Sequence, residues 1–146
     1  MAIDRMDWHY GGDFPEGLPT ENGGTHIGIY LAWIINNGLE GEFHKEESVE
    51  ELEKVRKREI TGRDFLQNAC DEKFWEEDLN EEGYSFTLDY YSNEDGYTEN
   101  GYVSDYEKVL VEGKCQSFYH VKNTWESYET IAPTISQRYK EWKAKQ

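Results

Sequence analysis

Six side chains in this sequence are suited to metal binding, proton transfer or nucleophilic attack: His9, His26, His44, His120, Cys70 and Cys115. No two histidines have the HxxxH or HExxH spacing that places both rings on one face of a helix, and the cysteines form no CxxC pair. No GxSxG sequence marks a nucleophilic serine. Spacing therefore predicts no metal site, no cofactor and no catalytic residue, although a Cys–His pair formed only in space stays open.

His9 and His26 flank a glycine-rich segment, residues 11–24, which contains five Gly and two of the three Pro of the chain. Such a segment is typical of an irregular surface loop. Loops on a rigid scaffold often carry function, so one hypothesis is a small-ligand or metal-binding protein, or an enzyme, that uses this loop. Its candidate residues are His9, Tyr10, Asp13, Asn22, Thr25 and His26, with Asp7, Asp13 or Glu21 as acidic neighbours. The alternative is that these side chains only cap and hydrogen-bond the loop.

Two further segments resemble a phosphate-binding loop and a calcium-binding loop, but each lacks residues that the motif requires. Gly23-Gly24-Thr25 before a helix resembles a phosphate cradle, but it lacks the P-loop lysine and is surrounded by acids. Asn93, Asp95 and Glu99 offer oxygen ligands to Ca²⁺, but an EF-hand register with Gly96 in sixth place puts tyrosines on two ligand positions. We therefore expect neither a nucleotide site nor an EF-hand.

The charge distribution is the most informative feature of the sequence. The 146 residues include 31 Asp or Glu and 15 Lys or Arg, a formal net charge of −16. Residues 71–107 alone hold 13 acids and 1 base, and they also hold nine aromatic side chains. Carboxylates steer a basic partner and tyrosines anchor it, so this segment predicts a surface for a basic protein. The candidate residues are Glu76, Glu77, Asp78, Glu81, Glu82, Asp89, Tyr91, Glu94, Asp95, Tyr97, Glu99 and Tyr102.

The alternative for this segment is a solvated acidic face that keeps the protein soluble while its aromatic side chains enter the core. In either case the charge excludes a phosphate-neutralising face for nucleic acid and disfavours anionic membranes. The chain shows no secretory signal, and its longest apolar run, residues 27–35, is too short to cross a bilayer. We therefore expect a cytoplasmic protein with reduced cysteines. The lack of a catalytic motif favours a binding protein and leaves the question of an enzyme open.

The pattern of the chain predicts one domain over residues 1–146, a mainly α-helical bundle around a buried central helix at about 26–37. Thr25 is the expected N-cap of that helix, which is apolar on nearly every side and ends at Gly38. Capping pairs Ser48/Glu51, Thr61/Asp64, Ser104/Glu107 and Asn123/Glu126 predict four further helix starts.

Two more elements are expected in the second half of the chain. A helix should cover about 76–92, and a short strand or hairpin should lie near 116–121. Apolar residues repeat at three- and four-residue steps from Trp125 to Trp142, which predicts a final helix. Pro133 lies inside it and should kink or break it.

Several sequence stretches together resemble a family of small acidic bacterial proteins of unknown function: Met6-Asp7-Trp8-His9-Tyr10, Asp13-Phe14-Pro15, Glu21-Asn22-Gly23, Thr25-His26-Ile27-Gly28 and Tyr119-His120-Val121. The resemblance spans about residues 4–142 and implies an intact domain, but no activity. The size and charge of the chain also resemble those of immunity proteins that neutralise bacterial toxins. We therefore expect an acidic binding protein, most concretely an inhibitor that occludes a basic toxin or nuclease domain.

Overall fold

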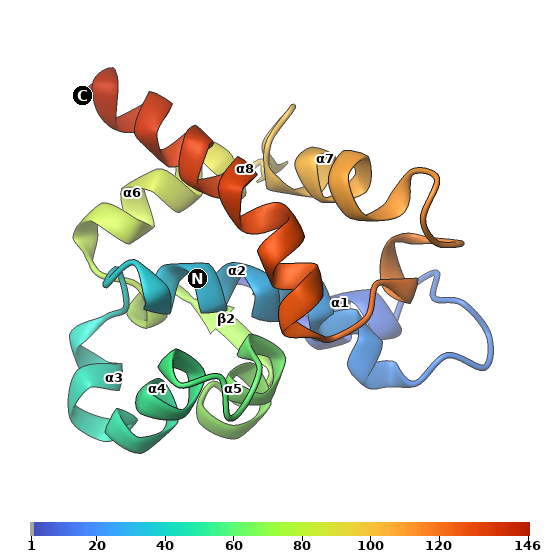
Figure 1. The fold of residues 1–146 in the computed structure, drawn as a ribbon, viewed down its shortest axis with the longest axis horizontal. Helices are drawn as coiled ribbons and strands as arrows, with labels where there is room; N and C mark the ends of the chain where they lie inside the picture. The colour runs from blue at the N-terminus through green and yellow to red at the C-terminus, as the bar shows by residue number, and fades with distance from the viewer. Residues whose placement is uncertain (1) are drawn as a thin grey trace.

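The computed structural model describes residues 2–146, which form a mainly α-helical structure with two small antiparallel strand pairs (Figure 1). In chain order the elements are β1 (Ala2–Arg5), α1 (Met6–Tyr10), the 3₁₀ turn η1 (Thr20–Gly24), α2 (Thr25–Asn36), α3 (Glu42–Glu47), α4 (Val49–Arg56), α5 (Gly62–Ala69), β2 (Lys73–Trp75), the 3₁₀ turn η2 (Glu76–Asp78), α6 (Glu81–Tyr90), β3 (Ser92–Asn93), β4 (Gly96–Tyr97), α7 (Tyr102–Tyr106), the π-helical turn η3 (Glu107–Val111), the 3₁₀ turn η4 (Phe118–His120) and α8 (Trp125–Ala144).

Helix α2 is the centre of the bundle, as its all-round apolar character predicts. Every residue from Thr25 to Ile35 is buried, and α2 packs against α4, α5 and α8. In Figure 1, α8 crosses over α2. Helices α3, α4 and α5 lie below α2 in this view, and α6 and α7 lie above it. The prediction of Thr25 as N-cap is wrong, because Gly24 holds that position and the Thr25 hydroxyl instead accepts a hydrogen bond from Arg63.

Strands β1 and β2 pair antiparallel and bring the N-terminus against the middle of the chain. In this register Asp4 lies opposite Phe74. The strand predicted near 116–121 is wrong: within residues 2–146 that segment contains no strand, and Phe118–His120 form η4. The Ser117 hydroxyl accepts a hydrogen bond from the Tyr119 amide, so a local side-chain cap replaces a sheet partner there.

The predicted helix starts are correct only in part. Thr61 and Asp64 form the predicted capping box of α5, with side chain to amide distances of 3.2 and 3.0 Å. The helix start predicted at Ser48 is correct, because Ser48 is the N-cap residue of α4. The Ser48/Glu51 capping box is absent, since the Ser48 hydroxyl is paired with the ring of His44.

Three other boundaries also shift. Helix α6 begins at Glu81 and not at 76, because the Asn80 side chain accepts from the Gly83 amide and caps it. Helix α7 begins after Gly101 and not at the Ser104/Glu107 pair. Thr124 caps α8 through the Ser127 amide, in place of Asn123.

Helix α8 runs continuously through Pro133, so a break at this residue, one of the two predicted outcomes, is wrong. Pro133 and Glu129, the residue whose carbonyl loses its amide partner, are both exposed, and water can satisfy that carbonyl. Among residues 2–146, no helix has both the length and the apolar character needed to cross a membrane.

Helices α2 and α5 approach each other closely where Gly28 meets Gly62. A Cβ added to Gly28 would overlap the backbone of Arg63, and one added to Gly62 would overlap the Gly28 carbonyl. Only glycine at both positions lets the two helix backbones touch.

We expect Gly28→Ala to lower the free energy of unfolding by about 3 kcal/mol, because overlap with backbone outweighs the gain of about 1 kcal/mol in helix propensity. Gly12→Ala is the control, since its Cβ would sit 3.4 Å from the Trp8 carbonyl oxygen, an ordinary contact. Urea unfolding followed by circular dichroism measures both. Equal stability of Gly28→Ala and the parent chain would contradict this packing.

Candidate functional site

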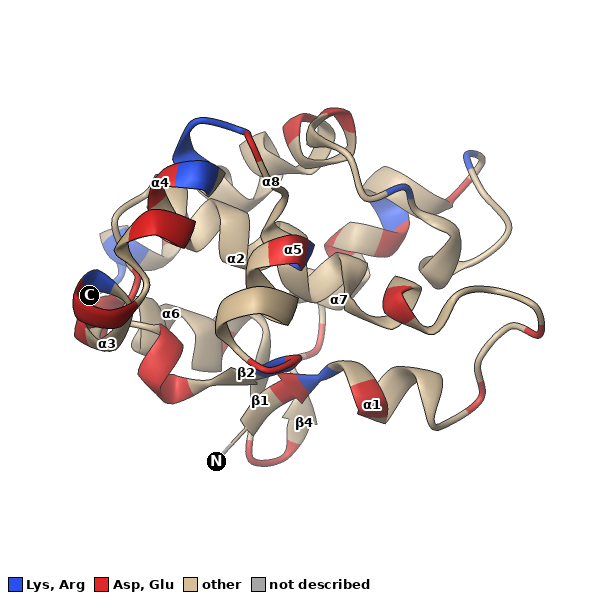
Figure 2. Ribbon diagram, turned by 90° about the horizontal axis from the view of Figure 1, so that it is seen from below, with Lys and Arg blue, Asp and Glu red and all other residues tan. Residues whose placement is uncertain are grey.

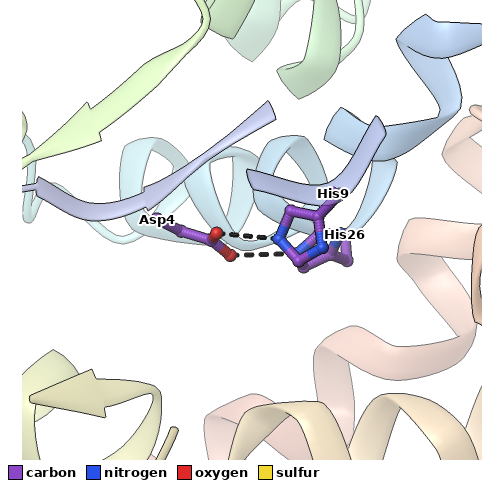
Figure 3. Close-up of side chains that lie close together, drawn as sticks. All are labelled: Asp4, His9 and His26. Carbon is purple, nitrogen blue, oxygen red and sulfur yellow. Dashed lines mark hydrogen bonds and ion pairs between the residues drawn. The ribbon is translucent and has the colours of Figure 1, made fainter. Parts of the chain in front are cut away.

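The carboxylate of Asp4 is fully buried and faces two histidine rings that lie side by side (Figure 3). One oxygen lies 2.8 Å from His9 Nε2 and the other lies 3.0 Å from His26 Nε2. The ring centroids of the two histidines are 4.4 Å apart and nearly perpendicular. The three side chains therefore direct their nitrogen and oxygen atoms toward one point.

Two tyrosines complete what we call the Asp4 cluster: Asp4, His9, His26, Tyr91 and Tyr97. The buried Tyr91 hydroxyl donates to Asp4 at 2.6 Å, and the Tyr97 hydroxyl lies 3.1 Å from His9 Nε2 and 3.3 Å from Asp4 Oδ2. Tyr97 is 47% exposed, whereas His9 is 8% and His26 1% exposed. The ring of Tyr97 therefore stands between the buried cluster and solvent.

Hydrogen bonds keep the Asp4 carboxylate charged in spite of its burial. Burial acts to raise the pKa of Asp4, but hydrogen bonds from His26 and His9 outweigh it and hold the pKa well below the ordinary value. Burial also lowers the pKa of His26, because it disfavours the imidazolium, while Asp4 opposes this shift only in part. The direction of this shift favours the neutral form of the His26 ring.

Two features of the chain bring the histidines together. Strand β1 runs directly into α1, so Asp4 and His9 lie one element apart on the same segment. On the other side, a Cβ on Gly24 would lie 2.7 Å from Met6 side-chain atoms, and one on Gly23 would lie 3.2 Å from the Met6 carbonyl. The paired glycines thus let η1 pack against α1, which places His26 beside His9.

Of the residues predicted for the loop site, His9 and His26 converge, and Asn22 lies nearby as a donor to the Tyr119 carbonyl. Tyr10, Asp13 and Thr25 are directed elsewhere: Tyr10 approaches Glu72, Asp13 is exposed and Thr25 faces Arg63. The acidic partner is Asp4 and none of the acids expected from the sequence. Tyr119 was also missed, and its hydroxyl lies 2.7 Å from His9 Nδ1.

The signal for Asp4 was weak but present. Asp4 directly follows Ile3 and lies two positions before Met6, and both of these apolar side chains are buried. A carboxylate in such a segment is a sign of a buried polar contact, but the partner is found only when β1 folds next to α2.

The predicted acidic partner surface divides into exposed and internal residues. Glu76, Glu77, Glu81, Asp89, Glu94, Asp95 and Glu99 are exposed. Tyr91 and Tyr102 are fully buried, so their assignment as surface anchors is wrong: they stack on each other inside the aromatic core. Asp78 is buried against His44.

Glu82 and Asp89 make contacts with the last helix. Glu82 pairs with Tyr139 and Lys143, and Asp89 accepts a hydrogen bond from the indole of Trp142 at 2.7 Å.

In Figure 2 the acidic turn between β3 and β4 lies at the lower edge of the view, below β1. Tyr97, on β4, is half exposed, so this one tyrosine keeps access to solvent.

Comparison with known proteins gives a family but no activity. Residues 2–121 match the family described as a domain of unknown function, DUF7832. The chain belongs to this family. The matched part of this DUF7832 chain contains the whole Asp4 cluster and ends before α8. No curated protein and no solved structure matches the chain. The resemblance to a family of unknown function is thereby confirmed, and the function has to be argued from the site.

We expect the DUF7832 chain to lose stability as the pH falls from 7 to 5. His26 has a lower pKa in the folded protein than in the unfolded chain, so the unfolded chain takes up a proton first, below about pH 6.5. The stability that His26 contributes at pH 7 is lost as the pH falls toward the pKa of His26 in the folded protein. The pKa of Asp4 is also lowered in the folded protein, so protonation of the unfolded chain removes further stability below about pH 4.

Urea unfolding at several pH values measures this effect. His26→Gln removes the titrating ring and should flatten the slope between pH 7 and 5, even though the variant is less stable overall. His120→Gln is the matched control outside the cluster, and its slope should stay close to that of the parent. An unchanged slope in His26→Gln would contradict the assignment.

Proposed function

We propose that this protein binds a divalent first-row transition-metal ion, such as Zn²⁺, through Asp4, His9 and His26. The observation that supports the proposal is the convergence of two imidazole nitrogens on one buried carboxylate, with all three ligand atoms within 4.8 Å of one another. Two histidines and one carboxylate form a ligand set used by catalytic zinc and non-haem iron sites. Nitrogen ligands favour these ions over Mg²⁺ and Ca²⁺.

Charge balance supports the same proposal. Among the described residues, the ion-pair partners of Asp4 are His9 and His26, whereas Arg5 pairs with Asp7. A buried carboxylate without a fixed cation is costly, and a bound metal ion would supply the missing positive charge. The net charge of −16 also raises the local concentration of cations.

The surroundings of the three ligands suit an ion better than an organic substrate. The Tyr119 hydroxyl next to His9 Nδ1 would fix the ring and its tautomer once Nε2 binds metal. Cavities of about 540 and 410 Å³ exist, but neither is lined by Asp4, His9 or His26. Tyr97 is the exposed member of the cluster and the side chain that has to move for an ion to enter.

We expect the purified, untagged chain to bind Zn²⁺ and Co²⁺ in isothermal titration and native mass spectrometry. His9→Gln should weaken binding at this site by more than about 100-fold, since losing even a residue that orients a ligand costs 10- to 100-fold. His120→Gln is the control and should bind as the parent does. Affinity should fall as the pH falls, because protons compete for the imidazoles.

Absence of Zn²⁺ binding by the folded parent chain would reject the proposal, as would equal affinity in His9→Gln and the parent. Circular dichroism of His9→Gln keeps loss of fold apart from loss of a ligand. Mg²⁺ and Ca²⁺ serve as hard-cation controls, and we expect neither to displace Zn²⁺.

We propose a second candidate function: binding of a basic protein partner in the cytoplasm, as an immunity-type inhibitor that occludes a toxin or nuclease domain. It is favoured by the exposure of what we call the acidic surface, namely Glu76, Glu77, Glu81, Glu94, Asp95 and Glu99. Exposed carboxylates of one sign accelerate association with a basic protein and keep nucleic acid and anionic membranes away. The two free cysteines, Cys70 and Cys115, suit a reducing compartment.

We expect Glu76→Lys, Glu77→Lys and Glu81→Lys together to slow association with a basic partner at least tenfold and to weaken its salt dependence. Capture from source-cell lysate at low and high salt identifies the partner, and its toxicity when expressed alone tests the immunity hypothesis. The control is the equal charge change Glu46→Lys, Glu47→Lys and Glu50→Lys on α3 and α4. An unchanged association rate in the first triple variant would reject this surface.

A further inference from the structure

A second buried group of ligand atoms lies away from the Asp4 cluster, and no motif spacing in the sequence connects its members. We call it the His44 cluster: His44 on α3, Cys70 at the end of α5 and Asp78 at the end of η2. His44 Nε2 lies 2.6 Å from Asp78 Oδ1 and 3.7 Å from Cys70 Sγ. The three residues are 1%, 6% and 8% exposed in the order His44, Asp78, Cys70.

Neighbouring groups hold the ligand atoms in place. His44 Nδ1 lies 2.9 Å from the Ser48 hydroxyl, which fixes the ring and leaves Nε2 directed at Asp78 and Cys70. The second oxygen of Asp78 accepts a hydrogen bond from the Trp75 amide at 2.7 Å, and the Gly41 amide donates to the Asp78 carbonyl at 3.1 Å. Such supporting contacts are typical of protein metal sites, where they orient the direct ligands.

The thiol is unsuited to nucleophilic catalysis in this environment. Burial, followed by the nearby charge of Asp78, raises the pKa of Cys70 well above its ordinary value. A protonated, buried thiol is a poor nucleophile. A metal ion changes this, since a coordinated thiol loses its proton outright.

We propose that His44, Cys70 and Asp78 form a buried zinc site that ties α3, α5 and η2 together. The ligand set is one nitrogen, one sulfur and one oxygen, which suits Zn²⁺ and Co²⁺ and excludes Mg²⁺ and Ca²⁺. Binding releases the Cys70 thiol proton and replaces the hydrogen bond between His44 and Asp78; the neutral ring then carries its proton on Nδ1, which faces the Ser48 hydroxyl, and water fills the fourth position. This site is independent of the metal site proposed at Asp4, and its near-complete burial assigns it a structural role.

Cobalt substitution tests the proposal, because only the His44 cluster contains sulfur. The chain is refolded with Co²⁺, since a buried site fills best during folding. We expect a thiolate-to-cobalt charge-transfer band in the near ultraviolet for the parent and for His9→Gln, which lacks an Asp4-cluster ligand. The band should be lost in Cys70→Ser and kept in Cys115→Ser, the matched control at the other cysteine.

Absence of the band in the refolded parent chain would overturn the proposal, as would its persistence in Cys70→Ser. If Cys70→Ser does not fold, X-ray absorption of the zinc-loaded parent decides: one sulfur scatterer near 2.3 Å supports the site, and none rejects it. Loss of one of two zinc equivalents in His9→Gln, with the cobalt band intact, would separate the two metal proposals, because His9 belongs to the first site and not to the second.

Discussion

The carboxylate of Asp4 is the buried negative charge on which the arrangement of the N-terminal half of the structure depends. Taking a carboxylate out of water is costly unless hydrogen bonds and charge compensate for it. Here the compensation comes from four parts of the chain: the Arg5 amide, His9, His26 and Tyr91 all contact this carboxylate. Satisfying one charge therefore fixes β1, α1, the start of α2 and the end of α6 relative to each other, around the core that α2 fills.

The sequence predicted what local chemistry and apolar periodicity can specify. Helix α2 was predictable because nearly all of its residues are apolar, so no other position than the centre of the bundle suits it. The Thr61/Asp64 capping box was predictable because its two hydrogen bonds join residues three positions apart. By contrast, Ser48 has the residue type of a cap, yet its hydroxyl is used by His44. A side chain that can cap a helix can equally serve another partner.

The site itself was only half predictable. The sequence indicated that His9 and His26 flank one loop. The acid that both rings contact, Asp4, comes from β1, and the position of β1 is set by pairing with β2 some 70 residues later. The aromatic residues of the acidic segment show the same limit. Tyr91 and Tyr102 occur among carboxylates in sequence, yet they are fully buried because α6 and α7 turn them toward α2. The density of charged residues along a segment predicts that part of it is exposed, but it does not predict whether the large side chains of that segment are buried.

The pairing of β1 with β2 has a consequence for how the molecule opens. Asp4 lies opposite Phe74 in this two-stranded sheet, and the next residue, Trp75, donates its amide to Asp78 of the His44 cluster. The two buried carboxylates are therefore joined by a few backbone hydrogen bonds of one small ladder. Separating β1 from β2 would hydrate both at once, so this ladder defines a cooperative local unfolding unit. Amide hydrogens at the two ends of the sheet should then exchange with solvent at a common rate.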